Sequence, residues 1–343
     1  VSDNSKGIAL VVNANRLIFD GGALDAQIAT QDFSVKSKQH ALEARIDERL
    51  LHLAAIWVEL ERYEILNQKI EDRMAVLSPL ISKLEQVAEA GLGDVGQVAA
   101  AQRTVTKIQV TQANVAEKLE AAKVNFVNAF GSLPENQQFD HELILKLMPE
   151  AVSKEMASRS AAIQMRYADY MAAEANLQAV LLRDGIKLGF ESRITRPFGA
   201  STRDSDESIG FALSKTLFNG KKNVSEIEQA KAQIDANIAN LSDSYKEASR
   251  VMKNAEQNVR SMKNAIELAR KNAQVASDEI VYLRKQLIIG GSTLDSVLSA
   301  EARLYEAESN EINFEAEKRK SELAILSGLS LLRTTIGVAQ QNN

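Results

Sequence analysis

Two stretches of the chain alternate between apolar and polar or small residues with a period of two. Across residues 186–214 the apolar positions are Ile186, Leu188, Phe190, Ile194, Ile209, Phe211 and Leu213, with a polar loop from Gly199 to Ser208 between the two halves. A similar alternation over residues 8–14 includes Leu10 and Val12. This period is typical of strands that have one apolar face. We therefore predict three strands, of which the last two form a hairpin.

The remaining pattern has apolar residues every three or four positions, which predicts long helices. We place these helices at residues 24–90, 95–130, 157–183, 221–289 and 293–327. Their clearest apolar seams are Ile46, Leu50, Leu53, Trp57 and Leu60; Val98, Ala101, Val105, Ile108, Gln112, Val115, Leu119, Ala122 and Phe126; and Val259, Met262, Ile266, Ala269, Ala273, Ala276, Ile280, Leu283 and Leu287. The alternating spacing of three and four is typical of coiled coils. Pro79 is predicted to kink the first helix.

The second half of the chain repeats the first. Phe218 lies 199 positions after Phe19, and Gly290 lies 199 positions after Gly91. Such a repeat indicates two copies of one unit, made of strands, a very long helix, a glycine-rich turn and a returning helix. The second copy has a helix and a strand before the point that corresponds to residue 1. We therefore expect about 40–60 further residues, carrying such a helix and strand, to precede residue 1 in the natural protein.

Composition narrows the function classes. The net charge of −5 argues against a nucleic-acid partner, because proteins that bind nucleic acid carry a basic surface. There are no cysteines, which excludes a disulfide scaffold and a thiolate metal site. Only 4 Pro and 16 Gly occur in 343 residues, so long uninterrupted helices are possible. No run of about 18 apolar residues is present that would predict a membrane-spanning helix.

The strands impose a requirement on assembly. Four short strands with one apolar face, three visible and one expected before residue 1, cannot close a barrel alone. Three copies would supply about 12 strands, which is within the range of outer-membrane barrels. Because the helices continue from the strands, a ring of strands implies a ring of helices. The sequence thus predicts a tube with coiled-coil walls.

The chain resembles the TolC family of trimeric outer-membrane channel proteins. The resemblance rests on the paired strand endings at residues 17–22 and 217–220 and on the two helix-turn-helix tips at residues 90–95 and 289–298, followed by Leu304-Tyr305. It covers nearly the whole chain. It implies a mainly helical fold in which a homotrimer forms a 12-stranded transmembrane β-barrel, continued into a coiled-coil tunnel that crosses the periplasm.

The resemblance also implies a function and partners. The expected role is an outer-membrane exit duct of a tripartite efflux or type I secretion system, passing small molecules or unfolded polypeptide. The expected partners are outer-membrane lipid, a periplasmic adaptor (membrane fusion) protein, and an inner-membrane pump or ABC transporter. No cofactor and no metal is expected.

Site residues follow from the same resemblance. Relatives constrict the periplasmic mouth with aspartates, and the matching positions here are Ser296 and Ser299, so a conventional aspartate ring is not expected. Asp94, Gln97 and Asp295 are candidates for lining the mouth, with a modest cation preference. The candidate adaptor-docking residues are Gly91, Leu92, Gly93, Val95, Gly290, Gly291, Ser292, Thr293 and Leu294. The candidate lipid-facing residues are Leu10, Val12, Ile186, Leu188, Phe190, Ile194, Ile209, Phe211 and Leu213.

The expected organisation has seven parts. They are a barrel strand (1–19), a first tunnel hairpin (20–131), an equatorial connector (132–156), a helix (157–184), a barrel strand pair with an extracellular loop (185–218), a second tunnel hairpin (219–328) and a C-terminal equatorial segment (329–343).

Other interpretations remain open. The strands could form hairpins of a soluble domain, and the whole chain could be a soluble coiled-coil scaffold. Asp94 and Asp295 could be ordinary helix N-caps. Catalysis has little support, because His40, His52 and His141 are far apart in the chain. His141-Glu142 opens like a zinc-protease motif, but Leu145 stands where a second histidine is needed.

Overall fold

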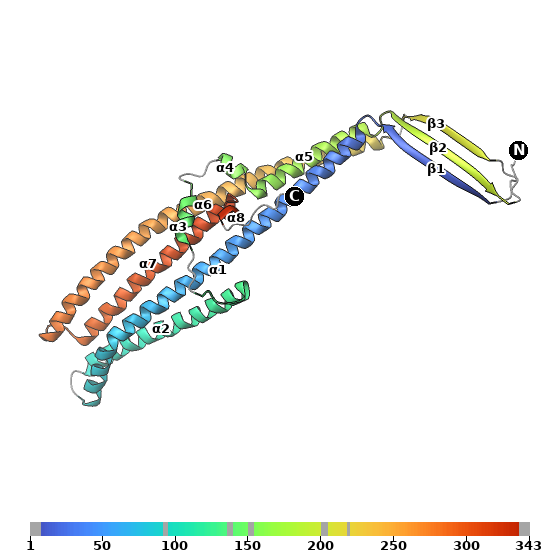
Figure 1. Cartoon of the computed structure of the whole chain (residues 1–343). Coiled ribbons are helices and arrows are strands. Elements are labelled where there is room, and N and C mark those ends of the chain that lie inside the picture. Colours follow the sequence, from blue (N-terminus) through green and yellow to red (C-terminus); the bar gives the residue numbers. More distant parts are fainter. Residues whose placement is uncertain are drawn as a thin grey trace. The chain divides into compact units, whose positions relative to one another are not determined.

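The computed structural model describes residues 8–91, 95–135, 140–149, 154–199, 205–217 and 220–335. The chain divides into two compact units, one made of residues 1–43 and 161–246 and the other of residues 44–160 and 247–343. Two 67-residue helices, α1 (Ala23–Glu89) and α6 (Lys222–Ile288), run from the first unit into the second (Figure 1). The two longest predicted helices are thus confirmed.

The first unit contains a three-stranded antiparallel sheet in the order β1-β2-β3, with β1 (Ile8–Phe19), β2 (Lys187–Phe198) and β3 (Asp206–Ser214). Residues directly opposite each other share a face of such a sheet. Val12 lies opposite Ile194, and Phe190 lies opposite Phe211. The register therefore gathers one apolar face from all three strands: Ile8, Leu10, Val12, Leu188, Phe190, Ile194, Phe198, Ile209, Phe211 and Leu213.

The opposite face of the sheet is mostly polar or small, although Val11 and Leu17 of β1 also lie on it. It carries Asn13 and Asn15 from β1, Glu191 and Arg193 from β2, and Ser208 and neighbouring small residues from β3. Among the described residues, β1 and β3 each pair only with β2, so both have an outer edge without a partner strand in a single chain. An open edge of this kind requires another strand or a covering segment.

The junction between β1 and α1 is a capped helix N-terminus. The carboxylate of Asp20 accepts hydrogen bonds from the backbone N–H of Gly22 (3.0 Å) and of Leu24 (2.7 Å) at the start of α1. Orphan N–H groups at a helix N-terminus are satisfied in this way. The Leu-Ile-Phe-Asp-Gly-Gly ending found in the sequence is therefore a strand-to-helix junction.

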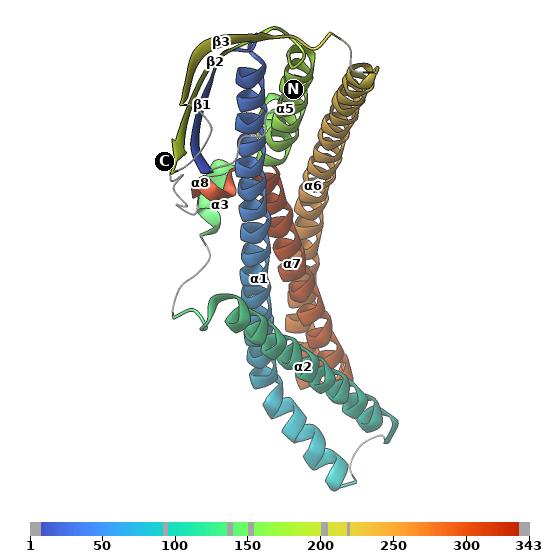
Figure 2. The same cartoon turned by 90° about the vertical axis from the view of Figure 1, so that its right-hand side faces the viewer.

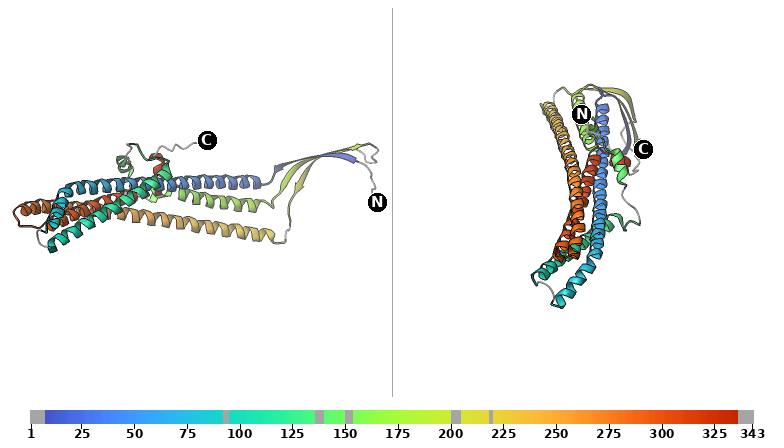
Figure 3. Two further views of the ribbon diagram at one scale, coloured as in Figure 1. Left: turned by 90° about the horizontal axis from the view of Figure 1, so that it is seen from below. Right: turned by 90° about the vertical axis from the view of Figure 1, so that its left-hand side faces the viewer.

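Helix α5 (Ala161–Leu182) packs beside the parts of α1 and α6 that belong to the first unit (Figure 3). Asp169 of α5 accepts a hydrogen bond from Ser37 of α1, and its backbone carbonyl accepts one from Asn237 of α6 (3.3 Å). Arg183 forms an ion pair with Glu226 of α6. Polar contacts thus join all three helices.

The prediction of one helix over residues 157–183 is wrong in detail. A short helix, α4 (Lys154–Ser158), ends before α5 begins. Tight turns close this gap, with Arg159 N–H donating to Met156 and Ser160 N–H donating to Ala157. Serine hydroxyls compete for backbone groups, and Ser158 donates to the Glu155 carbonyl. Two serines around Arg159 therefore interrupt a pattern that is otherwise helical.

The second unit is organised around α7 (Leu294–Gly328). One side of α7 joins a core with α1 and with α2 (Val95–Phe130), which includes Leu298 of α7 together with Ile70 and Ile108. Another side packs on α6 through Ala300 and Leu304. Figure 2 shows α7 lying alongside both α1 and α6. Short helices α3 (His141–Leu147) and α8 (Leu332–Thr335) cover the other end of α7.

Most residues of the seam predicted for α2 are buried, namely Ala101, Val105, Ile108, Val115, Leu119, Ala122 and Phe126. The seam predicted for α1 is only partly right. Leu60 is buried, but Trp57 is half-buried, and Ala54 and Val58 are the buried positions nearby. The reason is that α1 has two partners, since Trp57 packs edge-on against Phe126 of α2 while Val58 packs toward α7.

Helix α1 continues through Pro79 without a break. Figure 2 shows the last, cyan part of α1 turned away from the direction of the part before it. Proline removes one backbone hydrogen bond and crowds the preceding turn, which bends a helix. No helix within the described ranges is both long enough and apolar enough to cross a membrane.

Glu322 offers a test of the packing around α7. Its side chain is buried, at 4% exposure, and this burial raises the pKa of its carboxyl from the ordinary value. A carboxyl with a raised folded-state pKa weakens the fold as pH rises through that pKa, because folding then buries a charge. We expect Glu322→Gln to raise the free energy of unfolding at pH 7 by more than the roughly 0.5 kcal/mol typical of surface changes.

The measurement is denaturant unfolding at pH 7 and near pH 4, followed by helical circular dichroism. At the lower pH the two proteins should converge, since the wild-type carboxyl is then neutral in the folded state. Glu228→Gln, at an exposed position of α6, is the control. Equal stability of wild type and Glu322→Gln at both pH values would contradict the expectation.

Candidate functional site

The candidate site lies at one end of the second unit, where α1 and α6 both end (Figure 1). Each helix stops at a glycine with a left-handed backbone, Gly91 at φ +63° and Gly290 at φ +75°. Glycine adopts this conformation without strain and commonly terminates helices. The two positions are those that the sequence repeat relates, so both repeats reverse direction by the same device.

The second turn is described completely. Gly291 N–H donates to the Gln286 carbonyl (2.8 Å), and the Ser292 hydroxyl donates to the Leu283 carbonyl (2.9 Å). Thr293 is the N-cap of α7, because its hydroxyl accepts a hydrogen bond from Ser296 N–H (3.1 Å). The interpretation of Asp295 as the N-cap is therefore wrong. Asp295 stands in the first turn of α7, where a negative charge still favours the helix dipole.

Asp295 connects the two hairpins. Its carboxylate accepts a hydrogen bond from the hydroxyl of Thr104 in α2 (2.9 Å). Ser296 is engaged with Thr293, with 2.8 Å between the hydroxyl oxygens. Of the other candidate mouth residues, Ser299 is half-buried and Gln97 is exposed.

Of the candidate docking residues that the structure describes, Gly91, Val95, Gly290 and Gly291 are exposed, and Ser292, Thr293 and Leu294 are half-buried. Leu92, Gly93 and Asp94 lie outside the described residues. The exposed members leave the second turn, and the described residues on either side of the first turn, accessible on a single chain.

About two turns into α7, a buried carboxylate is held between two arginines. Glu301 is 1% exposed, and its two oxygens each lie 2.6 Å from a guanidinium nitrogen, one of Arg73 in α1 and one of Arg284 in α6. Arg73 also reaches Glu308 (3.1 Å), which Lys69 approaches at 3.4 Å. Charge-assisted bonds of this kind are short and directional. We call Glu301, Arg73 and Arg284 the Glu301 clamp.

The sequence interpretation missed the Glu301 clamp, although a signal for it exists. Val297, Glu301 and Leu304 are spaced by four and three residues, so Glu301 stands in an apolar seam. Charged residues are rarely buried without partners. A glutamate at a seam position therefore indicates arginine or lysine partners, but the partners themselves come from helices far away in the chain.

A cavity of about 470 Å³ lies between α1, α2 and α7 beside the Glu301 clamp. Its lining includes Arg73, Thr104 and Ser299, and also Lys107 and Tyr305. The same cavity thus adjoins both the Thr104–Asp295 bond and the arginine of the clamp. At this end of the unit the helices are thus joined both by a shared apolar core and by a few polar contacts around this cavity.

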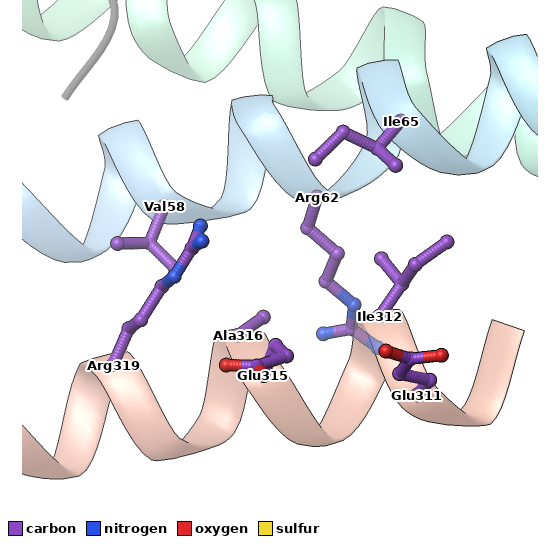
Figure 4. Close-up of a pocket in the computed structure, with 8 residues that line it drawn as sticks. All are labelled: Val58, Arg62, Ile65, Glu311, Ile312, Glu315, Ala316 and Arg319. Carbon is purple, nitrogen blue, oxygen red and sulfur yellow. The ribbon is translucent and has the colours of Figure 1, made fainter. Parts of the chain in front are cut away.

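Farther along α7, a smaller cavity of about 130 Å³ separates it from α1 (Figure 4). Figure 4 shows Arg62 of α1 extending toward α7, and Arg319 of α7 extending toward Val58 of α1. Arg62 donates to Asn313 (2.7 Å), and Arg319 lies 3.2 Å from Glu61. His141 of α3 contacts the same glutamate at 2.8 Å. These contacts hold the connector helix on the α1–α7 pair.

The candidate lipid-facing residues all belong to the apolar sheet face, except Ile186, which directly precedes β2. Most are exposed on a single chain, and Ile209, Phe211 and Leu213 are each more than 70% exposed. No group of three or more His, Asp or Glu that could hold a metal occurs among the described residues.

Comparison by sequence gives no relative. No protein-family model matches the chain, and no curated protein matches it.

Comparison by structure gives strong matches over nearly the whole chain. CusC, studied for its folding and transmembrane channel formation, matches with a TM-score of 0.81 at 15% identity, covering 95% of this chain and 81% of CusC. The outer membrane protein VceC of Vibrio cholerae matches with a TM-score of 0.78 at 16% identity, covering 94% and 79%. The open state of the Neisseria gonorrhoeae outer membrane channel MtrE matches with a TM-score of 0.69 at 14% identity, covering 94% and 80%. The chain therefore has the TolC-like fold of outer-membrane channel proteins.

Proposed function

We propose that the chain is one protomer of a passive exit duct in the outer membrane of a bacterium, extending into the periplasm. Three copies together close one barrel, to which each copy contributes its sheet of β1, β2 and β3. The duct receives its cargo from a periplasmic adaptor and an inner-membrane pump or ABC transporter. The energy comes from that partner.

The observation that carries this proposal is the apolar face of the sheet, which is interrupted only by Arg16 and by the Arg196–Glu207 pair among the described strand residues with a charge. Phe211, Leu213 and Ile209 are too exposed on a single chain for a water-soluble hairpin, and the opposite face is mostly polar or small. A membrane barrel needs this arrangement, with apolar residues toward lipid and polar residues toward a water-filled lumen. It also needs every strand edge paired, and the open edges of β1 and β3 are available for pairing with neighbouring copies.

Opening is proposed to occur at the helix turns. The exposed turn residues, such as Val95, Gly290 and Gly291, are the docking points for the adaptor. Movement of α7 away from α2 breaks the Thr104–Asp295 hydrogen bond and separates part of the apolar core that the two helices share. The Glu301 clamp, by contrast, keeps α1, α6 and α7 together. The moving part is therefore proposed to be α2 relative to the other three helices.

The test is planar-bilayer conductance of detergent-purified full-length protein with several cations. Discrete channels are expected, with a modest preference for cations because Asp295 and Asp94 place negative charge near the mouth. Asp295→Ala should lower that preference and increase the open time, since it also removes the bond from Thr104. Thr104→Ala is the matched control, because it removes the bond and keeps the charge.

Two results would argue against this proposal. A protein that is monodisperse without detergent, and silent in bilayers, would support the coiled-coil scaffold instead. Unchanged ion selectivity in Asp295→Ala would remove Asp295 from the mouth while leaving the duct intact.

A further inference from the structure

The cavity of about 470 Å³ between α1, α2 and α7 has an apolar inner wall. Ile70 of α1, Ile108 of α2 and Tyr305 of α7 line it, and all three are buried members of the core that these helices share. Ligand sites in proteins are mostly apolar with a few polar groups, and have volumes of roughly 300–1,000 Å³. The cavity therefore has the size and the kind of wall that suit a small organic molecule.

The charged residues in the lining are mostly cationic. They are Arg73, Lys107 and Arg303, with Glu306 as the acidic member. Arg303 is already paired with Glu279 of α6, with 2.6 Å between nitrogen and oxygen. Lys107 is exposed and forms no ion pair with any residue that the structure describes. Its ammonium group is therefore a positive charge in the lining that is free to meet an anion.

Arg73 has one hydrogen-bond donor left over. Its two terminal nitrogens pair with Glu301 (2.6 Å) and Glu308 (3.1 Å), whereas its buried Nε–H has no partner within the described part of the chain. A buried donor without an acceptor costs free energy, and folded proteins seldom contain one. A molecule bound in the cavity that Arg73 lines can supply the missing acceptor.

We propose that this cavity binds a small organic anion, such as an aromatic carboxylate. Its apolar ring lies against the wall formed by Ile70, Ile108 and Tyr305. Its carboxylate accepts hydrogen bonds from the Lys107 ammonium and the Arg73 Nε–H, and such charge-assisted bonds are stronger than neutral ones. An anion without an apolar part makes only the second set of contacts and should bind more weakly.

A bound anion also affects opening, and this part of the inference rests on the proposed exit duct. Arg73 belongs to α1 and Lys107 to α2, so the carboxylate joins the helix that is proposed to move to one of the three that stay together. A ligand shifts an equilibrium toward the state that it binds more tightly. The anion should therefore favour the closed arrangement, in which Thr104 is bonded to Asp295, and shorten the open time.

The probe is 2-naphthoate, and isothermal titration calorimetry measures its binding to the full-length protein in lipid nanodiscs. Lys107→Gln should weaken binding about fivefold, as the loss of one partly exposed ion pair does. Glu306→Gln should strengthen binding, because it removes the acidic residue of the lining. Ala302→Phe should abolish binding, since Ala302 lines the cavity and a larger side chain there fills it.

Two controls make the result specific. Lys118→Gln removes an exposed positive charge of α2 outside the cavity and should bind 2-naphthoate as the wild type does. The uncharged amide, 2-naphthamide, should bind the wild type about fivefold more weakly than 2-naphthoate and should not distinguish wild type from Lys107→Gln. Equal affinity of wild type and Lys107→Gln for 2-naphthoate, or binding that survives Ala302→Phe, would overturn the site.

Single-channel recording with 2-naphthoate tests the effect on opening. The open time should fall in the wild type and stay unchanged in Lys107→Gln, and a longer open time would overturn the preference for the closed arrangement. Binding by a protein that forms no channels would support the site and count against the exit duct. Channels formed by a protein that does not bind 2-naphthoate would overturn the site and leave the exit duct standing.

Discussion

Replacing Glu301 by glutamine should lower the free energy of unfolding by about 3 kcal/mol, since the change leaves buried guanidinium charge without its partner. Glu301 is 1% exposed and forms an ion pair with each of Arg73 and Arg284. This loss of free energy lies at the lower end of the usual range for a broken buried ion pair, because Arg73 keeps its ion pair with Glu308 and Arg284 is partly exposed. Chemical denaturation followed by helical circular dichroism measures the effect.

The matched control is Glu267→Gln on α6. Glu267 pairs with Lys271 at 2.9 Å, but both side chains are 69% exposed. An exposed pair of this kind contributes about 0.2–1 kcal/mol at most, and salt screens it. A loss in Glu301→Gln no larger than that in Glu267→Gln would mean that the Glu301 clamp does not hold α1, α6 and α7 together.

The clamp also makes a functional prediction. If α1, α6 and α7 move as one body during opening, Glu301→Gln should destabilise the protein without selectively favouring the open channel. Asp295→Ala should have the opposite profile, with a longer open time and a small change in stability. Comparing the two variants in bilayers and in denaturant therefore separates a contact that holds the helices together from one that breaks on opening.

Replacing Phe211 by arginine should prevent stable insertion of the sheet in a membrane. Phe211 is 72% exposed and lies opposite Phe190, in the middle of the apolar face. Arginine on the lipid face of a barrel costs about 2–4 kcal/mol at the bilayer centre, and each copy in the assembly would add this cost. We expect a large fall in the amount of folded trimer recovered from membranes.

Ala212→Arg is the control for this change. Ala212 is the next residue of β3, lies on the polar face and is opposite Gly189, which leaves room for a longer side chain. It should be recovered from membranes in nearly wild-type amount, with an altered conductance because it faces the lumen in the proposed barrel. Equal recovery of Phe211→Arg and Ala212→Arg would show that the apolar face does not meet lipid, and would favour a soluble scaffold.

Local patterns in the sequence were sufficient for most elements. The ends of α1 and α6 were predictable because glycines 91 and 290 allow the left-handed backbone that stops a helix. The strands were predictable because their alternation has a period of two, and the register follows from placing apolar residues on one face. The buried seam of α2 was predictable because one face of that helix meets all its partners.

The prediction from sequence failed where one helix packs against two partners, and where side chains compete with the helix for backbone hydrogen bonds. The seam of α1 was displaced because α2 and α7 approach it from different sides, which no single periodicity describes. The break before α5 depends on hydrogen bonds between the backbone and Ser158 or its neighbours. The free energy of these bonds is little greater than that of the helical hydrogen bonds that they replace. Asp295 was a reasonable N-cap candidate, but Thr293 is better placed for that role.

The sequence by itself determined the long helices, the turns and the one-sided strands, because these depend on neighbours within a few residues along the chain. Only the tertiary structure decided that Glu301 is held by Arg73 and Arg284, and that Asp295 reaches Thr104. It also decided which residues line the cavity between α1, α2 and α7. The physical reason is that these contacts join residues from different helices, and their geometry depends on how the helices cross rather than on any local pattern.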